Sequence, residues 1–332
     1  MIGSLGGWFA SLIGFPSAWL LGAMLAVLAA NVLGAKVHMP SSSTTFISWI
    51  LGISLSSGFD LAIIEHISLW SGSLFLMFLM LIVSLGILHY FYTHICGWNP
   101  KESLLASVPG NLNVVLIFAA QENVDAKRIA MVHTLRIFAI VFSLPLLFPI
   151  VDRVSNAGLS INNDIQELML VVISSGIIGE VARRIKVPAG MLLGSLASAL
   201  FFKFYFNIQI VISPAWFHIL LIVLGTYSAV RMSGVNLGLL IQSVKSGLGG
   251  VALTLLVSFV FSLVLYASSD ISLLQALLSY LPGGIEVAIA IAFSTNVDPV
   301  FVATHQVLRV VLMSLLLPVV YQFVKSDLFS KN

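Results

Sequence analysis

Apolar residues fill this chain in long runs that short polar stretches separate. Twelve runs form two series of six, and most approach the ~20 residues that a helix needs to cross a bilayer. The first series lies near 2–14, 16–34, 45–64, 68–95, 102–121 and 126–150, and the second near 167–184, 188–206, 215–230, 246–268, 272–294 and 299–323. The longest polar stretch, Asp152–Glu167, is too short to bury a core of its own. The pattern predicts an all-α polytopic membrane protein without a separate water-soluble domain.

The second series repeats the first. The segment LLASVPGNLNVVLIFAA at 104–120 is echoed by LLSYLPGGIEVAIAIAF at 277–293, which places Pro109 and Pro282 173 residues apart. The same spacing relates four further pairs, Gly52 and Gly225, Asp125 and Asp298, Arg136 and Arg309, and Pro145 and Pro318. The opening sequence PSAWLLG at 16–22 returns as PAGMLLG at 188–194, at a spacing of 172. We therefore predict two membrane repeats at 1–150 and 167–325, joined by a linker at 151–166.

The fifth segment of each series contains a helix-breaking sequence. Pro-Gly-Asn at 109–111 and Pro-Gly-Gly at 282–284 stand at its middle, where proline removes a hydrogen bond and clashes with the preceding turn. Each segment is expected to form two half-helices, which either cross the membrane as one broken helix or turn back as a re-entrant hairpin. In lipid such a break is tolerated only where protein or a water-filled cavity satisfies the backbone, so it indicates a cavity.

The distribution of basic residues favours the re-entrant hairpin. We counted the Lys and Arg residues on each side of the membrane for hairpins and a cytoplasmic N-terminus, leaving out Arg136 and Arg309, which lie within apolar segments. Only Arg153 and Lys203 then lie on the side away from the cytoplasm. The residues that lie inside are Lys36, Lys101, Lys127, Arg128, Arg183, Arg184, Lys186, Arg231, Lys245, Lys325 and Lys331. Each repeat then has five transmembrane helices plus one hairpin, about ten crossings in total, and the second repeat is inverted relative to the first. Both termini are expected in the cytoplasm.

Composition narrows the classes of function. Hydrophobic residues make up 59% of the 332 residues and charged residues 8%, and the mean hydropathy is +1.08; soluble proteins carry roughly a quarter charged residues. The net charge of +2 and the scattered basic residues argue against nucleic acid as a partner. Cys96 is the single cysteine, and the sequence has no metal-binding histidine pattern, nucleophile motif or phosphate-binding loop. We expect no enzymatic activity, no metal and no cofactor other than Na⁺ or H⁺ as a coupling ion.

Arg136 and Arg309 are the first candidates for a site. Each lies about ten residues into an apolar helix, at a depth where a charge costs at least about 2.5 kcal/mol. One interpretation is that they bind an anionic substrate, because a guanidinium can donate two parallel hydrogen bonds to a carboxylate. The alternative is an internal ion pair, most plausibly with Glu286, or snorkelling towards the interface. Backbone amides at the two breaks are expected to point at the same anion, and they belong to Gly110, Asn111, Gly283 and Gly284.

A coupling-ion site is expected near the same breaks. Glu286 lies four residues past Pro282 and aligns with Asn113 of the first repeat. Glu286 could bind a cation or carry a proton, with Ser107, Asn111 and Asn113 as neutral oxygen ligands for sodium. The alternative is that Glu286 only neutralises an arginine.

Two histidines precede the arginines at helical spacing. His133 and His305 lie three and four residues before Arg136 and Arg309, so each shares roughly one helix face with its arginine, and Gln306 follows directly. Substrate contact by His133 and Gln306 and proton transfer by His305 are one interpretation, and buried histidines that simply bond to neighbouring groups are the other. Asp125 and Asp298 are assigned to structure, as N-caps, with Asn123 and Asn296 in the same turns.

These motifs resemble the duplicated membrane AbrB family. The resemblance rests on PSAWLLG, its copy at 188–194, and the two Pro-Gly hairpins, each followed by Val-Asp and then by His and Arg, and it covers almost the whole chain. Members have been labelled AbrB-like regulators or putative ammonia monooxygenases. A DNA regulator would need a polar reading head and a monooxygenase clustered metal ligands, and this sequence has neither. The resemblance implies a fold similar to inverted-repeat secondary transporters, such as those of 2-hydroxycarboxylates.

The sequence thus predicts a secondary membrane transporter of a small anionic organic solute, coupled to sodium or protons. Substrate would lie between the two hairpins, in a protein of the cell membrane that works by alternating access. The alternative is a membrane-embedded ligand sensor or regulatory scaffold that acts on a partner protein. The expected partners are the lipid bilayer and the solute, without nucleic acid, and small-residue runs such as 247–250 leave a homo-oligomer open.

Overall fold

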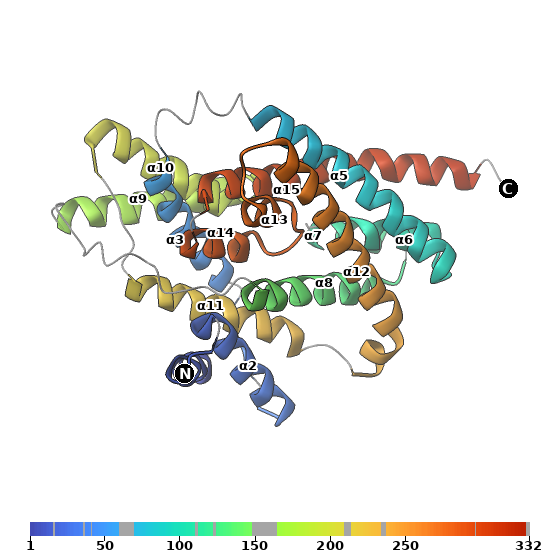
Figure 1. Ribbon diagram of the computed structural model, residues 1–332, viewed down its shortest axis with the longest axis horizontal. Helices are drawn as coiled ribbons and strands as arrows, with labels where there is room; N and C mark the ends of the chain where they lie inside the picture. Colours follow the sequence, from blue (N-terminus) through green and yellow to red (C-terminus); the bar gives the residue numbers. More distant parts are fainter. Residues whose placement is uncertain are drawn as a thin grey trace. The chain divides into compact units, whose positions relative to one another are not determined.

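The computed structural model describes residues 1–15, 17–35, 37–40, 42–59, 70–109, 112–121, 124–147, 165–208, 214–233, 237–295 and 297–329. All regular structure in these ranges is helical, without strands (Figure 1). The helices of the first half are α1 (Ile2–Leu12), α2 (Ala18–Val32), α3 (Ser42–Gly58), α5 (Ser71–Tyr90) with the π-helical turn η2 (Phe91–Ile95), α6 (Pro100–Ser107), α7 (Leu112–Gln121) and α8 (Ala126–Leu147). Those of the second half are α9 (Ile165–Arg184), α10 (Gly190–Phe206), α11 (Pro214–Ser233), α12 (Leu237–Ser268), α13 (Leu273–Tyr280), α14 (Ile285–Ser294) and α15 (Pro299–Phe329). The predicted all-helical class is confirmed.

Among the described helices, four are long and apolar enough to cross a membrane. They are Ser71–Ile95, Ala126–Leu147, Lys245–Ser268 and Pro299–Gln322. Shorter apolar helices accompany them at Ala18–Val32, Gly190–Phe206, Trp216–Val230 and Ile285–Ser294. These helices confirm the prediction of a membrane-embedded protein.

α12 and α15 extend well beyond the apolar runs that predict them. α12 begins at Leu237 instead of 246, and α15 continues to Phe329 instead of 323. Hydrophobicity marks the length of chain that lipid covers, whereas backbone hydrogen bonds extend a helix into polar sequence equally well. Apolar runs therefore located these helices but understated their length.

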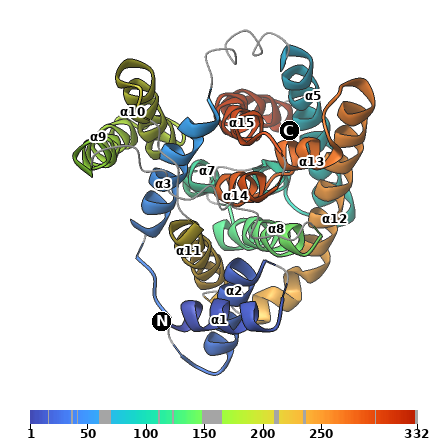
Figure 2. The same cartoon turned by 60° about the vertical axis from the view of Figure 1, so that its left-hand side comes forward.

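The first of two compact units consists of Met1–Ser68, Val141–Ser233 and Ile285–Ala303. Within it α1 packs on α2, and α9 packs on α10, which run side by side in Figures 1 and 2. Glycines let the two backbones of each pair approach. A Cβ on Gly22 would lie 2.6 Å from the carbonyl oxygen of Gly6, and one on Gly194 would lie 2.7 Å from the Cα of Gly179. Gly22 and Gly194 end the two copies of the opening motif, so the repeated sequence forms a repeated contact.

The same unit contains a reciprocal exchange between the repeats. Gly225 of α11 packs against the carbonyl oxygen of Leu20 in α2, and Gly52 of α3 packs against the carbonyl oxygen of Leu192 in α10. Leu20 and Leu192 are equivalent positions of the opening motif. The third helix of each repeat therefore packs on the second helix of the other, which ties the two repeats together within one unit.

The second unit consists of Leu69–Ile140, Gly234–Gly284 and Thr304–Asn332. Within it α5 and α12 lie side by side (Figure 2), and Gly249 and Gly250 of α12 pack against Phe91 and Tyr92. A buried cluster on the first-repeat side of this unit contains Leu88, Tyr92, Trp98, Ala106 and Val132. Each unit thus gathers corresponding helices from both sequence repeats. The second unit carries most of the predicted site.

Candidate functional site at the broken helices

Both predicted helix breaks are present, and their backbones match. α6 ends at Ser107 and α7 begins at Leu112, while α13 ends at Tyr280 and α14 begins at Ile285. The C-cap residues are extended, Val108 with φ −62° and ψ 122° and Leu281 with φ −64° and ψ 123°. A residue that precedes proline disfavours the helical region, so Pro109 and Pro282 end the two helices in the same way.

The two ends of the first broken segment lie close together. The carboxylate Oε1 of Glu102, at the start of α6, accepts a hydrogen bond of 3.2 Å from the backbone N–H of Asp125, just before α8. The guanidinium of Arg128 lies 4.1 Å from the ring centroid of Trp98, which precedes α6. The chain therefore returns, after α6 and α7, to the place from which it entered the segment.

Arg136 and Arg309 are buried, with exposed fractions of 3% and 1%, and both bond to the backbone of the breaks. Arg136 Nη2 donates to the carbonyl oxygen of Val108 at 2.8 Å, and Arg309 Nη1 donates to that of Leu281 at 2.7 Å. Arg309 Nη2 also donates to the carbonyl oxygen of Gly283 at 3.2 Å. Each arginine thus places a positive charge at the carbonyl end of a half-helix, where the helix dipole is negative.

His133 and Gln306 occupy equivalent positions in the two repeats. His133 Nε2 lies 3.0 Å from the carbonyl oxygen of Leu105, and Gln306 Nε2 donates to that of Leu278 at 2.5 Å and of Leu281 at 3.1 Å. His133 Nδ1 faces Arg136 Nη2 at 2.9 Å. The structural counterpart of His133 is therefore Gln306, and the sequence comparison of His133 with His305 did not identify this equivalence.

His305 bonds to a different element. Its Nε2 lies 2.9 Å from Ser73 Oγ of α5, and the hydroxyl of Tyr280 donates to the carbonyl oxygen of Ser73 at 2.6 Å. Ser73 and Tyr280 were absent from the predicted site, because a serine within an apolar run and a tyrosine before a break give no distinctive signal. Ser107 is buried and donates to the carbonyl oxygen of Ser103 in its own helix at 2.7 Å.

Glu286 belongs to the first unit, in the first turn of α14. Its Oε1 accepts a hydrogen bond of 3.2 Å from Ser48 Oγ of α3. Within the second unit, no described carboxylate forms an ion pair with Arg136 or Arg309. Ion pairs in the first unit join Glu180 to Arg183 and Arg184, at one end of α9.

The other predicted site residues are glycines and asparagines at or next to the two breaks. Gly110 and Asn111 lie outside the described residues, and so does the side chain of Asn113, although its backbone belongs to α7. Gly283 packs against α8, since a Cβ there would lie 2.7 Å from Ile140 Cγ2, one turn past Arg136. Gly284 is half-buried in the same break. The break of the second repeat therefore lies against the arginine-bearing helix of the first.

The two aspartates predicted to be N-caps are confirmed in that role. Asp125 Oδ1 accepts from the N–H groups of Lys127 and Arg128, and Asp298 Oδ1 accepts from those of Val300 and Phe301. Asn123 and Asn296 lie outside the described residues. Among the described residues no group of three His, Cys, Asp or Glu side chains could hold a metal ion.

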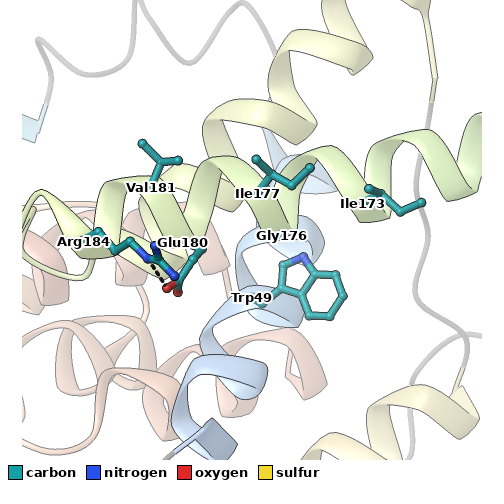
Figure 3. Close-up of a pocket in the computed structure, with 7 residues that line it drawn as sticks. All are labelled: Trp49, Ile173, Gly176, Ile177, Glu180, Val181 and Arg184. Atoms are coloured by element: carbon teal, nitrogen blue, oxygen red, sulfur yellow. Dashed lines mark hydrogen bonds and ion pairs between the residues drawn. The ribbon is translucent and has the colours of Figure 1, made fainter.

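A surface groove of about 440 Å³ lies in the first unit, between α3 and α9 (Figure 3). Its lining is mainly apolar, with Trp49, Ile173 and Ile177, and its two charged side chains, Glu180 and Arg184, bond to each other at 2.8 Å. The indole of Trp49 is fixed by a hydrogen bond of 2.9 Å from Nε1 to Ser175 Oγ. The groove contains none of the predicted site residues.

The fold and the breaks define a class of helical membrane proteins in which a broken helix occurs twice. At each break a buried arginine donates a hydrogen bond to a backbone carbonyl oxygen. The chain belongs to the family described as transition state regulatory protein AbrB, whose sequence profile matches residues 19–325. The family resemblance found in the motifs is thereby confirmed.

The chain is similar to the uncharacterized protein YhjN of Bacillus subtilis (strain 168). The two are 26% identical over 357 aligned positions, which cover 97% of this chain and 91% of YhjN. No solved structure matches the chain.

Proposed function

We propose that this protein is a secondary transporter of a small anionic organic solute, coupled to sodium or protons, with the solute bound at the broken helices. The observation that carries the proposal is the pair of buried arginines whose guanidinium groups bond to carbonyl oxygens. Carbonyl oxygens accept from the Nη groups of both arginines but have no net charge, so both positive charges lack a counter-charge among the described residues of the second unit. An anion would supply it, in surroundings where an unpaired charge is expensive.

Arg309 is the stronger candidate for contact with the solute. Its Nε is buried and has no hydrogen-bond partner among the described residues, and the same holds for Gln306 Oε1. A buried donor without a partner destabilises the protein by about 1–3 kcal/mol. A carboxylate next to Arg309 would accept a hydrogen bond from Nε, and its negative charge would compensate the positive charge of the guanidinium.

The proposed topology has two inverted repeats, about ten crossings, re-entrant hairpins and cytoplasmic termini in the plasma or inner membrane. It is supported by the contact of Glu102 with Asp125, which holds the ends of the first hairpin together, and by the basic residues of the connecting segments. In an alternating-access cycle, the hairpins would be exposed first to one side of the membrane and then to the other. Glu286, with one oxygen bound to Ser48, would take the coupling ion. The proposal includes no catalytic step and no resident cofactor.

The test combines ligand screening with transport. Purified protein is first screened for thermal stabilisation by mono-, di- and tricarboxylates, with and without sodium, and stabilising anions are then measured for uptake into proteoliposomes. We expect Arg309→Ala to abolish both stabilisation and uptake, while Arg183→Ala, which removes an exposed arginine paired with Glu180, leaves both intact. Uptake by folded Arg309→Ala at the wild-type rate would refute the role of this arginine. Stabilisation without uptake in any gradient would favour the sensor instead.

The coupling ion has a separate test. Glu286→Gln keeps the size of the side chain and removes its charge, so transport should lose its dependence on the sodium or proton gradient while anion stabilisation is retained. Gradient-driven accumulation that survives this substitution would place the coupling site elsewhere.

A further inference from the structure

The two prolines at the breaks each leave one carbonyl without its helical partner. In an α-helix the carbonyl of residue i accepts from the N–H of residue i+4. The partners of Leu105 and Leu278 would be residues 109 and 282, and both are proline, which has no N–H. A buried carbonyl must find another donor or destabilise the fold. Leu105 is fully buried, and Leu278 is fully buried as well.

The missing donor comes from a neighbouring helix in each repeat. His133 Nε2 of α8 reaches the carbonyl oxygen of Leu105, and Gln306 Nε2 of α15 reaches that of Leu278. We propose that His133 and Gln306 are positioning residues that replace the N–H groups that Pro109 and Pro282 lack, and that they fix the carbonyl ends of the half-helices for the arginines. This role does not depend on what the breaks bind.

The hydrogen-bond partners of His133 fix its protonation state. A carbonyl oxygen only accepts, so Nε2 must carry the proton that bonds to Leu105. A guanidinium only donates, so Nδ1, which faces Arg136 Nη2, must be unprotonated. The ring is therefore the neutral Nε2–H tautomer, with one donor and one acceptor.

A glutamine amide offers the same pair of groups, a neutral N–H donor and an acceptor oxygen. That explains how glutamine can stand at position 306 and histidine at position 133 with equivalent backbone partners. His133 is thus a neutral hydrogen-bond bridge between the carbonyl oxygen of Leu105 and the guanidinium of Arg136.

The first test exchanges the two residue types. His133→Gln and Gln306→His should each fold with a thermal midpoint close to that of the wild type. His133→Ala and Gln306→Ala leave a buried carbonyl without a donor and should lower the midpoint by about 5 °C. His94→Ala, which removes an exposed histidine of η2, is the matched control and should change little. A His133→Gln variant as unstable as His133→Ala would overturn the proposal.

The second test uses the proline itself. Pro109→Ala restores an N–H at residue 109 and allows α6 to extend, so Leu105 can bond within its own helix. His133→Ala should then lower the thermal midpoint by less in the Pro109→Ala background than in the wild type. Equal losses in both backgrounds would contradict the replacement of the proline N–H.

The third test reads the tautomer directly. In ¹⁵N-histidine-labelled protein at pH 7, the signals that disappear in His133→Gln should be those of a neutral ring protonated at Nε2. Signals of a charged ring, or of a ring protonated at Nδ1, would overturn the assignment even if the alanine variants failed to fold.

Discussion

Arg136, Arg309 and Lys203 each place a cation at the carbonyl end of a helix. The two arginines do so at the breaks, and Lys203 Nζ of α10 donates to the carbonyl oxygens of Ser56, Ser57 and Phe59 at the end of α3, at 2.9, 3.1 and 2.6 Å. The last carbonyls of a helix have no intrahelical partner and form the negative end of its dipole. Backbone carbonyl oxygens thus bind all three of these cations.

The bonds of Lys203 should contribute to stability independently of the candidate site. Lys203→Met keeps the apolar stem and removes three charge-assisted hydrogen bonds, so the free energy of unfolding should fall by about 1–3 kcal/mol. Lys203→Arg, which keeps the donors, should recover part of the loss. Thermal melts in detergent measure both. A Lys203→Met variant that melts with the wild type would show that water replaces these bonds without loss.

The helices of this protein are shaped by proline at their breaks and by glycine at their contacts. Pro109 and Pro282 end α6 and α13 with nearly identical backbone angles at Val108 and Leu281. Gly52 and Gly225 bring α3 and α11 against carbonyl oxygens of α10 and α2. A side chain at either glycine would meet backbone, which cannot move aside as a flexible side chain can.

Substitution of these contact glycines should therefore be severe. Gly52→Leu and Gly225→Leu should lower the free energy of unfolding by about 3 kcal/mol or more and reduce the yield of folded protein. Gly72→Leu is the matched control, because a Cβ at Gly72 of α5 has no neighbouring atom within 4 Å. Size-exclusion profiles and thermal melts measure the effect. Equal behaviour of the three variants would argue against close packing of α3 on α10 and of α11 on α2.

Over the whole chain, two sequence repeats contribute to two compact units without coinciding with them. The first unit contains the first three helices of each repeat, and the second contains α5 and α12 with the broken-helix elements α6, α7 and α13. Reciprocal packing, such as that of α11 on α2 and of α3 on α10, relates the repeats within the first unit. A duplicated sequence can form such contacts twice because each contact uses the same residues in exchanged roles.

Membrane orientation is testable with two residues that flank the first broken segment. In a Cys96→Ser background, Lys101→Cys before this segment and Lys127→Cys after it should both react with a membrane-impermeant maleimide from the cytoplasmic side only. The reason is that Glu102 and Asp125, their near neighbours, are hydrogen-bonded to each other. Labelling of whole cells and of inside-out vesicles makes the comparison. Reaction of the two cysteines from opposite sides would establish a crossing segment and remove the basis for inverted repeats.

Features with a local cause were predictable from the sequence. The Pro-Gly pairs at 109–110 and 282–283 marked both helix breaks, and Asp298 followed by Pro299 caps a helix through local bonds alone. Contacts with partners from elsewhere in the chain were not predicted. His133 was compared with His305 by chemical type, yet backbone equivalence pairs it with Gln306, and His305 bonds to Ser73, far away in sequence. A comparison of the repeats at their common spacing of 173 would have identified Gln306.

Long apolar runs and composition by themselves determined that this chain is a helical membrane protein, and the constant spacing between repeats determined its duplication. Both are properties of the chain that hold before any segment meets another. Tertiary structure alone decided that the buried arginines bond to carbonyl oxygens, and which helix of one repeat packs on which helix of the other. Those choices depend on groups brought together from distant positions, since a charge or an unpaired carbonyl specifies what kind of partner it needs but not where in the chain that partner lies.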